Sequence, residues 1–145
     1  LKDAIDKAKK EITLSWYHFK TRGSHGSYPD VIMASLIAAA QRGVKVLVLL
    51  DQKQDPGEEN TRENMQTKER LMKGGVIVHL DSPFTTTHTK MAVMDGKHTF
   101  IGSHNLTQSG LKYNHEISVL IESPQVAAEA RDYIESLIQV KQGDQ

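Results

Sequence analysis

Apolar and polar positions in the first half of the chain follow helix-like and strand-like periods in turn. Residues 44–50 are almost continuously apolar, as expected of a central strand covered on both faces. A second apolar stretch beginning at Asp30 has the period of a buried helix, with Asp30 as its N-cap. The predicted elements, in chain order, are a helix at 2–10, a strand at 11–19, a helix at 30–42, a strand at 44–50, a helix from 61 to the glycines at 74 and 75, and a strand at 76–80. Strands and helices alternating at this spacing indicate parallel βαβ units.

The second half has a different pattern. Two short apolar runs at 89–94 and 97–101 flank Asp95-Gly96, which is a strong signal for a hairpin turn. A further strand is expected at 117–121, and Ser123-Pro124 form a good start for a last helix. We therefore predict one α/β domain over residues 1–145, built on a mixed, mostly parallel β-sheet flanked by α-helices.

The predicted hairpin gathers polar residues into one patch. His88 and Lys90 lie two positions apart, so on a strand both side chains point to the same face. If the turn holds only two residues, Met94 pairs with Lys97 and His88 lies opposite Ser103. In that register Ile101 would share a face with Lys90, and a bulge could correct this mismatch.

This patch has the chemistry needed to stabilise a transferring phosphoryl group. Histidine can act as a nucleophile or as a general acid and base near neutral pH, and Lys90 offers a fixed positive charge to phosphoryl oxygens. Ser103 and Asn105 add neutral hydrogen bonds, while Gly102 permits close approach of the backbone. Such groups suit the equatorial oxygens of a pentacoordinate phosphorane. A two-metal mechanism is not indicated, because no carboxylate cluster accompanies the patch.

Zinc is the alternative suggested by the histidines. Four of the seven lie near one another in the sequence, at positions 88, 98, 104 and 115. Cysteine is absent, and no acidic partner completes a ligand set. We therefore expect no metal site and no cofactor.

The patch reads H-x-K-x4-D-x6-G-S-x-N and resembles the HKD signature of the phospholipase D superfamily. The matching residues are His88, Lys90, Asp95, Gly102, Ser103 and Asn105. The resemblance extends over nearly the whole chain: residues 30–52 look like the first helix and following strand of that family, and residues 114–137 like its closing strand and helix. Glu116 stands where the family keeps an acid.

The resemblance implies a mechanism and an assembly. Family members usually carry two motifs, and single-motif members such as small bacterial endonucleases and mitochondrial cardiolipin hydrolase form homodimers that share one site. One His88 would attack phosphorus, and its symmetry mate would protonate the leaving oxygen. Lys90 and Asn105 would hold phosphoryl oxygens, and Glu116 would fix the tautomer of His88. Ser103 would support this network, and Asp95 would be structural.

Charge limits the kind of nucleic-acid binding that is expected. Eighteen basic residues balance eighteen acidic ones, which argues against non-specific, charge-driven binding but not against a local basic cleft. Lys20, Arg22 and His104 are candidate substrate contacts. No apolar run is long enough to span a membrane. We expect a soluble protein, cytoplasmic or, if a signal segment has been removed, periplasmic.

Three hypotheses follow for function. The first is a metal-independent endonuclease that acts through a covalent phosphohistidine on DNA, with RNA left open as an alternative substrate. The second is a phospholipid hydrolase, for which an apolar rim is expected; Pro83 and Phe84 supply little of one, since three threonines follow them. The third is a module excised from a larger restriction or repair protein, either catalytic or limited to binding and dimerisation.

Overall fold

The computed structural model describes residues 1–143, and its centre is a six-stranded mixed sheet with the strand order β3-β2-β1-β4-β5-β6. The elements, in chain order, are α1 (Lys2–Lys7), β1 (Glu11–Trp16), α2 (Tyr28–Gln41), β2 (Lys45–Leu50), α3 (Glu59–Lys73), β3 (Ile77–Leu80), β4 (Lys90–Met94), β5 (His98–Gly102), the π-helical turn η1 (Ser109–Tyr113), β6 (Ser118–Glu122) and α4 (Pro124–Gly143). The predicted succession of helices and strands is therefore confirmed.

The sheet is mixed as predicted, but parallel pairs are not its majority. Strands β1, β2 and β3 pair in parallel, as expected of βαβ units. The other three pairings within residues 1–143, namely β1–β4, β4–β5 and β5–β6, are antiparallel. The difference arises because the β4–β5 hairpin joins the sheet beside β1, so β1 has a parallel neighbour on one side and an antiparallel neighbour on the other.

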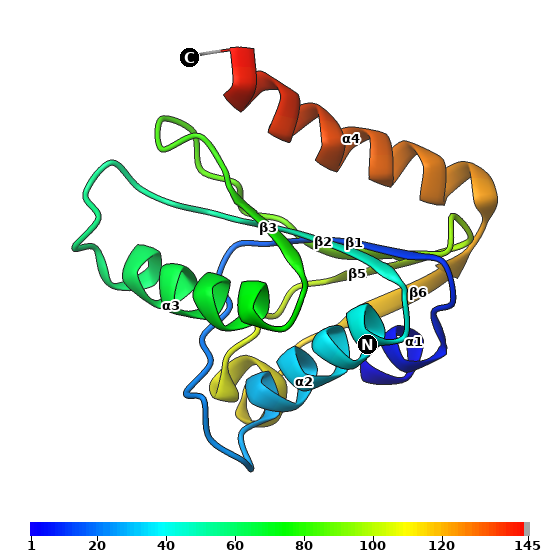
Figure 1. The fold of residues 1–145 in the computed structure, drawn as a ribbon, viewed down its shortest axis with the longest axis horizontal. Coiled ribbons are helices and arrows are strands. Elements are labelled where there is room, and N and C mark those ends of the chain that lie inside the picture. Colours follow the sequence, from blue (N-terminus) through cyan, green and yellow to red (C-terminus); the bar gives the residue numbers. More distant parts are fainter. Residues whose placement is uncertain (144–145) are drawn as a thin grey trace.

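The helices form two unequal layers on the sheet. In Figure 1, α1, α2 and α3 cover one face, and α4 alone crosses the other. The main core lies under the three helices and includes Trp16, Phe19 and Leu36, all fully buried. A smaller core joins Ile134 and Ile138 of α4 to Leu49 of β2. The α4 face is therefore thinly covered, which leaves room beside the helix.

Two helix starts differ from the sequence prediction by a few residues. Ser27, rather than Asp30, caps α2: its hydroxyl accepts a hydrogen bond from the backbone N–H of Asp30. The Asp30 side chain is used instead to hold the preceding loop, where it accepts from the backbone N–H groups of Arg22 and Gly23. Helix α3 begins at Glu59, two residues before the predicted start at Thr61, and Glu58 caps it, because its carboxylate accepts from the N–H groups of Asn60 and Thr61.

The hairpin turn contains three residues, not two. Met94 pairs with His98, and Met91 pairs with Ile101, so Lys97 is an extra residue at the turn. Asp95 and Gly96 both have positive φ, of 57° and 62°, as this tight turn requires. The one-residue shift places Ile101 opposite Met91, so Ile101 no longer shares a face of the sheet with Lys90 as the two-residue turn would require. Across the described residues, no helix is long and apolar enough to cross a membrane.

Candidate active site

The segment that carries His88 is held by the carboxyl ends of the three parallel strands. Asp51, directly after β2, is buried and accepts a hydrogen bond of 2.8 Å from the backbone N–H of Thr87. Asp81, directly after β3, accepts from the Thr87 hydroxyl. Past the end of β1, the N–H of Tyr17 donates to the carbonyl of Thr89 at 2.9 Å. Three strand ends thus fix the backbone on both sides of His88, and the loops after β2 and β3 lie at one end of the sheet (Figure 1).

His88 and Lys90 lie together, as their spacing predicts. The ammonium of Lys90 is 3.4 Å from each ring nitrogen of His88, so it faces the imidazole, while the His88 side chain is exposed to solvent. The ring of Tyr17 packs against the same imidazole with centroids 4.6 Å apart, and Lys90 lies 5.5 Å from the Tyr17 centroid. Lys90 is only 8% exposed, and this burial lowers its pKa despite the favourable charge of Glu116.

Asn105 follows β5 and is fixed by its neighbours in the chain. The carbonyl of His104 accepts from the indole N–H of Trp16, and Leu106 forms a bridge with Phe19. Within the described chain, Asn105 Oδ1 is buried and has no hydrogen-bond partner. Buried amides are normally satisfied, so an unpaired one is typical of a group that meets a ligand.

Ser103 of the motif is hydrogen-bonded to Glu116, which lies outside the motif. The hydroxyl of Ser103 donates to the Glu116 carboxylate, which also accepts from the Asn114 amide at 3.4 Å. The bond from Ser103, followed by that from Asn114 and the charges of His104 and Lys90, lowers the pKa of Glu116 and outweighs burial. The expected hydrogen bond from the His88 imidazole to the Glu116 carboxylate is not formed in this chain, where the imidazole contacts Tyr17 and Lys90 instead.

Two motif residues lie away from the open site. The Asp95 carboxylate accepts hydrogen bonds from the backbone N–H groups of Lys9, Lys10 and Glu11, so it ties the hairpin turn to the segment before β1. Gly102 is packed tightly: a Cβ atom there would lie 3.0 Å from the ring of His104 and 3.2 Å from the Cβ of Ser118. These contacts agree with the structural roles expected of Asp95 and Gly102.

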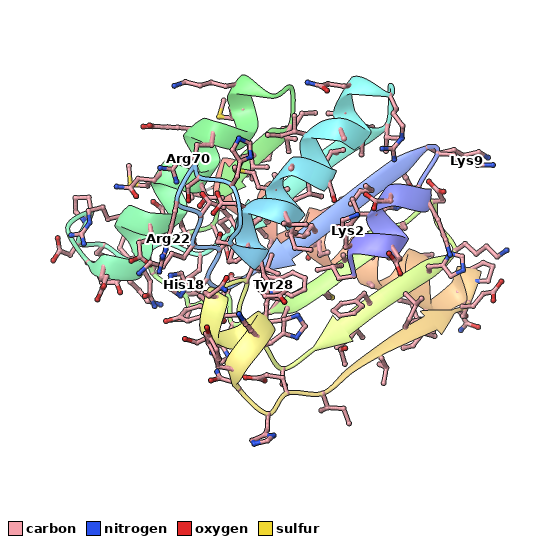
Figure 2. The ribbon with its side chains drawn as sticks, turned by 90° about the horizontal axis from the view of Figure 1, so that it is seen from below. Lys2, Lys9, His18, Arg22, Tyr28 and Arg70 are labelled. Atoms are coloured by element: carbon pink, nitrogen blue, oxygen red, sulfur yellow. The ribbon has the colours of Figure 1, made fainter. Side chains whose placement is uncertain are left out.

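The three predicted substrate contacts do not converge on His88. His104 is 7% exposed and packs against Trp16 and Phe100, so its ring is part of the interior and not of an open cleft. Lys20 forms an ion pair with Glu63 at 2.8 Å. Arg22 and Arg70 lie on the side of the sheet covered by α2 and α3 (Figure 2). The burial of the His104 ring argues against a direct substrate contact, and the predicted role of this residue stays a prediction.

Three residues of the site were not singled out from the sequence. Tyr17 lies in the predicted strand at 11–19, where an aromatic side chain is more often part of the core than of a site. Lys53 lies 3.1 Å from Asp51 Oδ2, donates to the Thr86 hydroxyl at 2.5 Å and approaches the Tyr17 ring at 5.6 Å. The available signal was position: Asp51 and Lys53 directly follow a buried parallel strand, where ligand sites of open α/β sheets occur.

A cavity of about 360 Å³ opens next to His88, between the loop after β3 and α4. Its walls include Phe84, Thr85, Thr86, Thr87, Tyr133 and Leu137. Among the described residues, no group of three or more His, Cys, Asp or Glu side chains could hold a metal ion. Of the histidines considered for zinc, His98 approaches the Glu122 carboxylate at 3.9 Å.

Comparison with known proteins identifies the family. The family described as "Cardiolipin synthase, PLD-like domain" matches residues 1–138. The chain belongs to the phospholipase D superfamily. Members of this superfamily are phosphodiesterases, which agrees with the enzyme class predicted from the HKD residues.

Individual relatives support the same conclusion. "Phospholipase D" of Rickettsia conorii is 30% identical over 123 residues, which cover 85% of this chain and 54% of the relative. The chain thus spans about half the length of the curated phospholipases D that it matches. Nuc from Salmonella typhimurium, a phospholipase D family member, is 26% identical with a TM-score of 0.79, covering 95% of this chain and 84% of Nuc. NucT from Helicobacter pylori, at 18% identity and a TM-score of 0.72 over 95% of this chain and 84% of NucT, shares the fold.

Proposed function

We propose that this chain is a metal-independent nuclease in which His88 forms a covalent phosphohistidine. The observation that carries the proposal is the exposed imidazole of His88, which faces the ammonium of the buried Lys90 at 3.4 Å. A phosphoryl group attacked by His88 would have its oxygens next to Lys90. The amide of Asn105, whose oxygen has no partner in the described chain, is a further group for those oxygens.

The reaction proceeds in two steps. A ring nitrogen of one His88 forms a bond to phosphorus, while the bond from phosphorus to the leaving oxygen breaks. The leaving oxygen takes a proton from a second His88. That second imidazole then accepts a proton from water, whose oxygen attacks phosphorus and releases the first His88. Lys90 balances the charge on the phosphoryl oxygens in both steps, so a metal ion is not needed for that purpose.

The second His88 belongs to a second copy of the chain. One chain supplies one exposed His88, and the reaction requires two imidazoles in complementary protonation states. An apolar surface next to Glu116 supports an interface there: Tyr113, Ile117 and Val119 are all more than half exposed. Exposed apolar patches beside a functional site mark protein–protein contacts.

The mechanism is tested with single-stranded and double-stranded oligonucleotides in excess chelator. We expect cleavage to continue in chelator, His88→Asn to abolish it, and a labelled phosphoryl group to be trapped on His88 by acid quench of the wild-type reaction. The assembly is tested by sedimentation at working concentrations. Activity that vanishes with chelator, persists in His88→Asn, or belongs to a strict monomer contradicts the proposal.

A phospholipid hydrolase is the second candidate. Phe84 is 77% exposed at the mouth of the cavity beside His88, and Tyr133 and Leu137 extend this apolar surface. The curated relatives named phospholipase D and cardiolipin synthase are consistent with it. Parallel assays on an oligonucleotide and on cardiolipin vesicles separate the two: a nuclease cleaves the first at least tenfold faster. Since the chain spans half of those relatives, it is also consistent with a catalytic module of a longer protein.

A further inference from the structure

The cavity beside His88 has an unusual combination of walls. One side is a run of threonines in the loop after β3, and the other is formed by α4 through Tyr133 and Leu137. Phe84 stands at its mouth, 77% exposed, and Tyr133 is 52% exposed. We call this cavity the threonine pocket, defined by Phe84, Thr85, Thr86, Thr87, Tyr133 and Leu137. His88 itself lines it, so a ligand in the pocket lies next to the proposed nucleophile.

The loop that forms the threonine pocket is anchored rather than loose. Thr87 is buried, donates its hydroxyl to Asp81 and is bound through its N–H to Asp51. The Thr86 hydroxyl accepts from the ammonium of Lys53 at 2.5 Å. The pocket therefore has a fixed polar floor with a cation at its rim, while its aromatic residues remain exposed.

These walls suit a planar, polar ligand better than a hydrocarbon chain. Two exposed aromatic rings offer faces for stacking, which is how proteins hold unpaired bases. Threonine hydroxyls donate and accept hydrogen bonds, as base edges require and as acyl chains do not. The volume of about 360 Å³ lies at the small end of ligand pockets, which span about 300–1,000 Å³. Lys53 at the rim adds a positive charge for a neighbouring phosphate.

We infer that the threonine pocket binds one unpaired nucleobase of the substrate, adjacent to the phosphodiester that His88 attacks. The inference rests on the proposed nuclease function and extends it to a substrate class. A base can enter the pocket only after it leaves a duplex stack, so single-stranded nucleic acid is the preferred substrate. Phe84 is then a binding residue that stacks on the base.

The test separates base binding from phosphate binding. His88→Asn protein, which cannot turn over substrate, is titrated into a fluorescent eight-nucleotide oligo(dT) and into an eight-unit abasic deoxyribose-phosphate strand, with anisotropy as the readout. We expect oligo(dT) to bind about tenfold more tightly than the abasic strand, in line with stacking of one base. Adding Phe84→Ala should weaken the affinity for oligo(dT) until it equals the affinity for the abasic strand, and the affinity for the abasic strand should not change.

Two further variants serve as controls. Phe84→Tyr keeps an aromatic face and should preserve the preference for bases. Tyr28→Ala removes another exposed aromatic ring, at the start of α2 and outside the pocket, and should change neither affinity. Because the Phe84 side chain is mostly exposed, its removal should leave the unfolding temperature unchanged, which thermal melting checks.

The outcomes distinguish this inference from the proposed function. If the wild type cleaves oligonucleotides but His88→Asn binds both strands equally, or Phe84→Ala weakens both alike, the pocket does not hold a base while the nuclease proposal stands. If the wild type cleaves no nucleic acid and His88→Asn binds neither strand, the proposed nuclease function is contradicted, and the inference that rests on it is contradicted with it. If Phe84→Ala leaves oligo(dT) binding intact but raises the KM for dihexanoyl phosphatidylglycerol, the pocket holds an acyl chain, and the inference is overturned.

Discussion

The ring of Tyr17 packs against the imidazole of His88 with centroids 4.6 Å apart and planes inclined by 55°. The same tyrosine is bound at both ends, because its N–H donates to Thr89 and its hydroxyl accepts from the Asn60 amide at 3.2 Å. Tyr17 is thus a firmly held support for the proposed nucleophile, placed directly after the end of β1.

Replacing Tyr17 with leucine should lower kcat about 10- to 100-fold with little change in KM, because a misplaced nucleophile loses near-attack geometry. Tyr17→Phe retains the ring and loses only the contact with Asn60, so most of the activity should remain. Steady-state kinetics on an oligonucleotide measures both parameters. An equal loss in the two variants would assign the effect to the hydroxyl and not to the support of His88.

Lys90 should make stability depend on pH in the alkaline range. In the folded protein, burial lowers the pKa of Lys90 below the ordinary lysine value of 10.5, which applies to the unfolded chain. Between these two pKa values the unfolded chain therefore binds more protons than the folded protein. Stability then rises with pH across that window, and is lower below it, where the buried ammonium is charged. Lys90→Met should lack this rise and be at least as stable as the wild type at pH 7, while its activity is lost. Urea denaturation at a series of pH values tests this; a less stable Lys90→Met at pH 7 would contradict it.

Asp95 should contribute stability that acid removes. Burial alone would raise its pKa, but hydrogen bonds from the N–H groups of Lys10, Lys9 and Glu11 outweigh it and hold the pKa lower than usual. A carboxyl group whose pKa is lowered by folding stabilises the fold fully at pH values above its unfolded pKa of about 3.9. This stabilisation is lost as the pH falls through the lower pKa of the folded state.

Asp95→Asn keeps a residue that tolerates the positive φ of 57° and removes the charge. At pH 7 we expect the free energy of unfolding to fall by about 1–3 kcal/mol. Chemical denaturation at pH 7 and at pH 3 should show this difference shrinking in acid, where wild-type Asp95 becomes protonated. A difference that stays constant would mean that the charge of Asp95 is not the cause.

Gly110 in η1 controls the position of Asn105. A Cβ atom at Gly110 would lie 2.3 Å from the backbone oxygen of Asn105, closer than atoms can approach. Gly110→Ala should therefore displace Asn105 and reduce kcat/KM by about 100-fold, as a displacement of about 1 Å does elsewhere. Gly57→Ala is the matched control, because its Cβ would meet only the side chain of Asp55 in an exposed loop. Comparable kinetics in the two variants would exclude this coupling.

The order of elements and the HKD patch could be predicted from the sequence, and the exact register could not. Period and turn signals placed each strand within a few residues, because local chemistry dominates there. Lys97 is an extra residue in the hairpin turn, which the Asp95-Gly96 pair alone does not reveal. The balance of parallel and antiparallel pairs was missed because the pairing of β1 with β4 joins residues about 80 positions apart.

The surroundings of the motif were the least predictable part. Tyr17 resembles its neighbour Trp16 in sequence, yet Trp16 is buried in the core and Tyr17 faces His88. His104 lies inside the signature, but its ring turns into the interior beside Phe100. These outcomes depend on which face of a strand the sheet buries, and long-range pairing decides that rather than local sequence.

Because β1 lies between β2 and β4, the strand pairing that completes the sheet also brings the catalytic groups together. Residues 1–80 contain the three parallel strands, and β4 pairs with the other edge of β1, so without β4 the backbone groups along that edge would be unpaired. Lys90 begins β4, so the step that protects this edge also brings His88 and Lys90 against Tyr17. A chain truncated before β4 should therefore expose an unpaired strand edge that favours aggregation, and it would also lack Lys90.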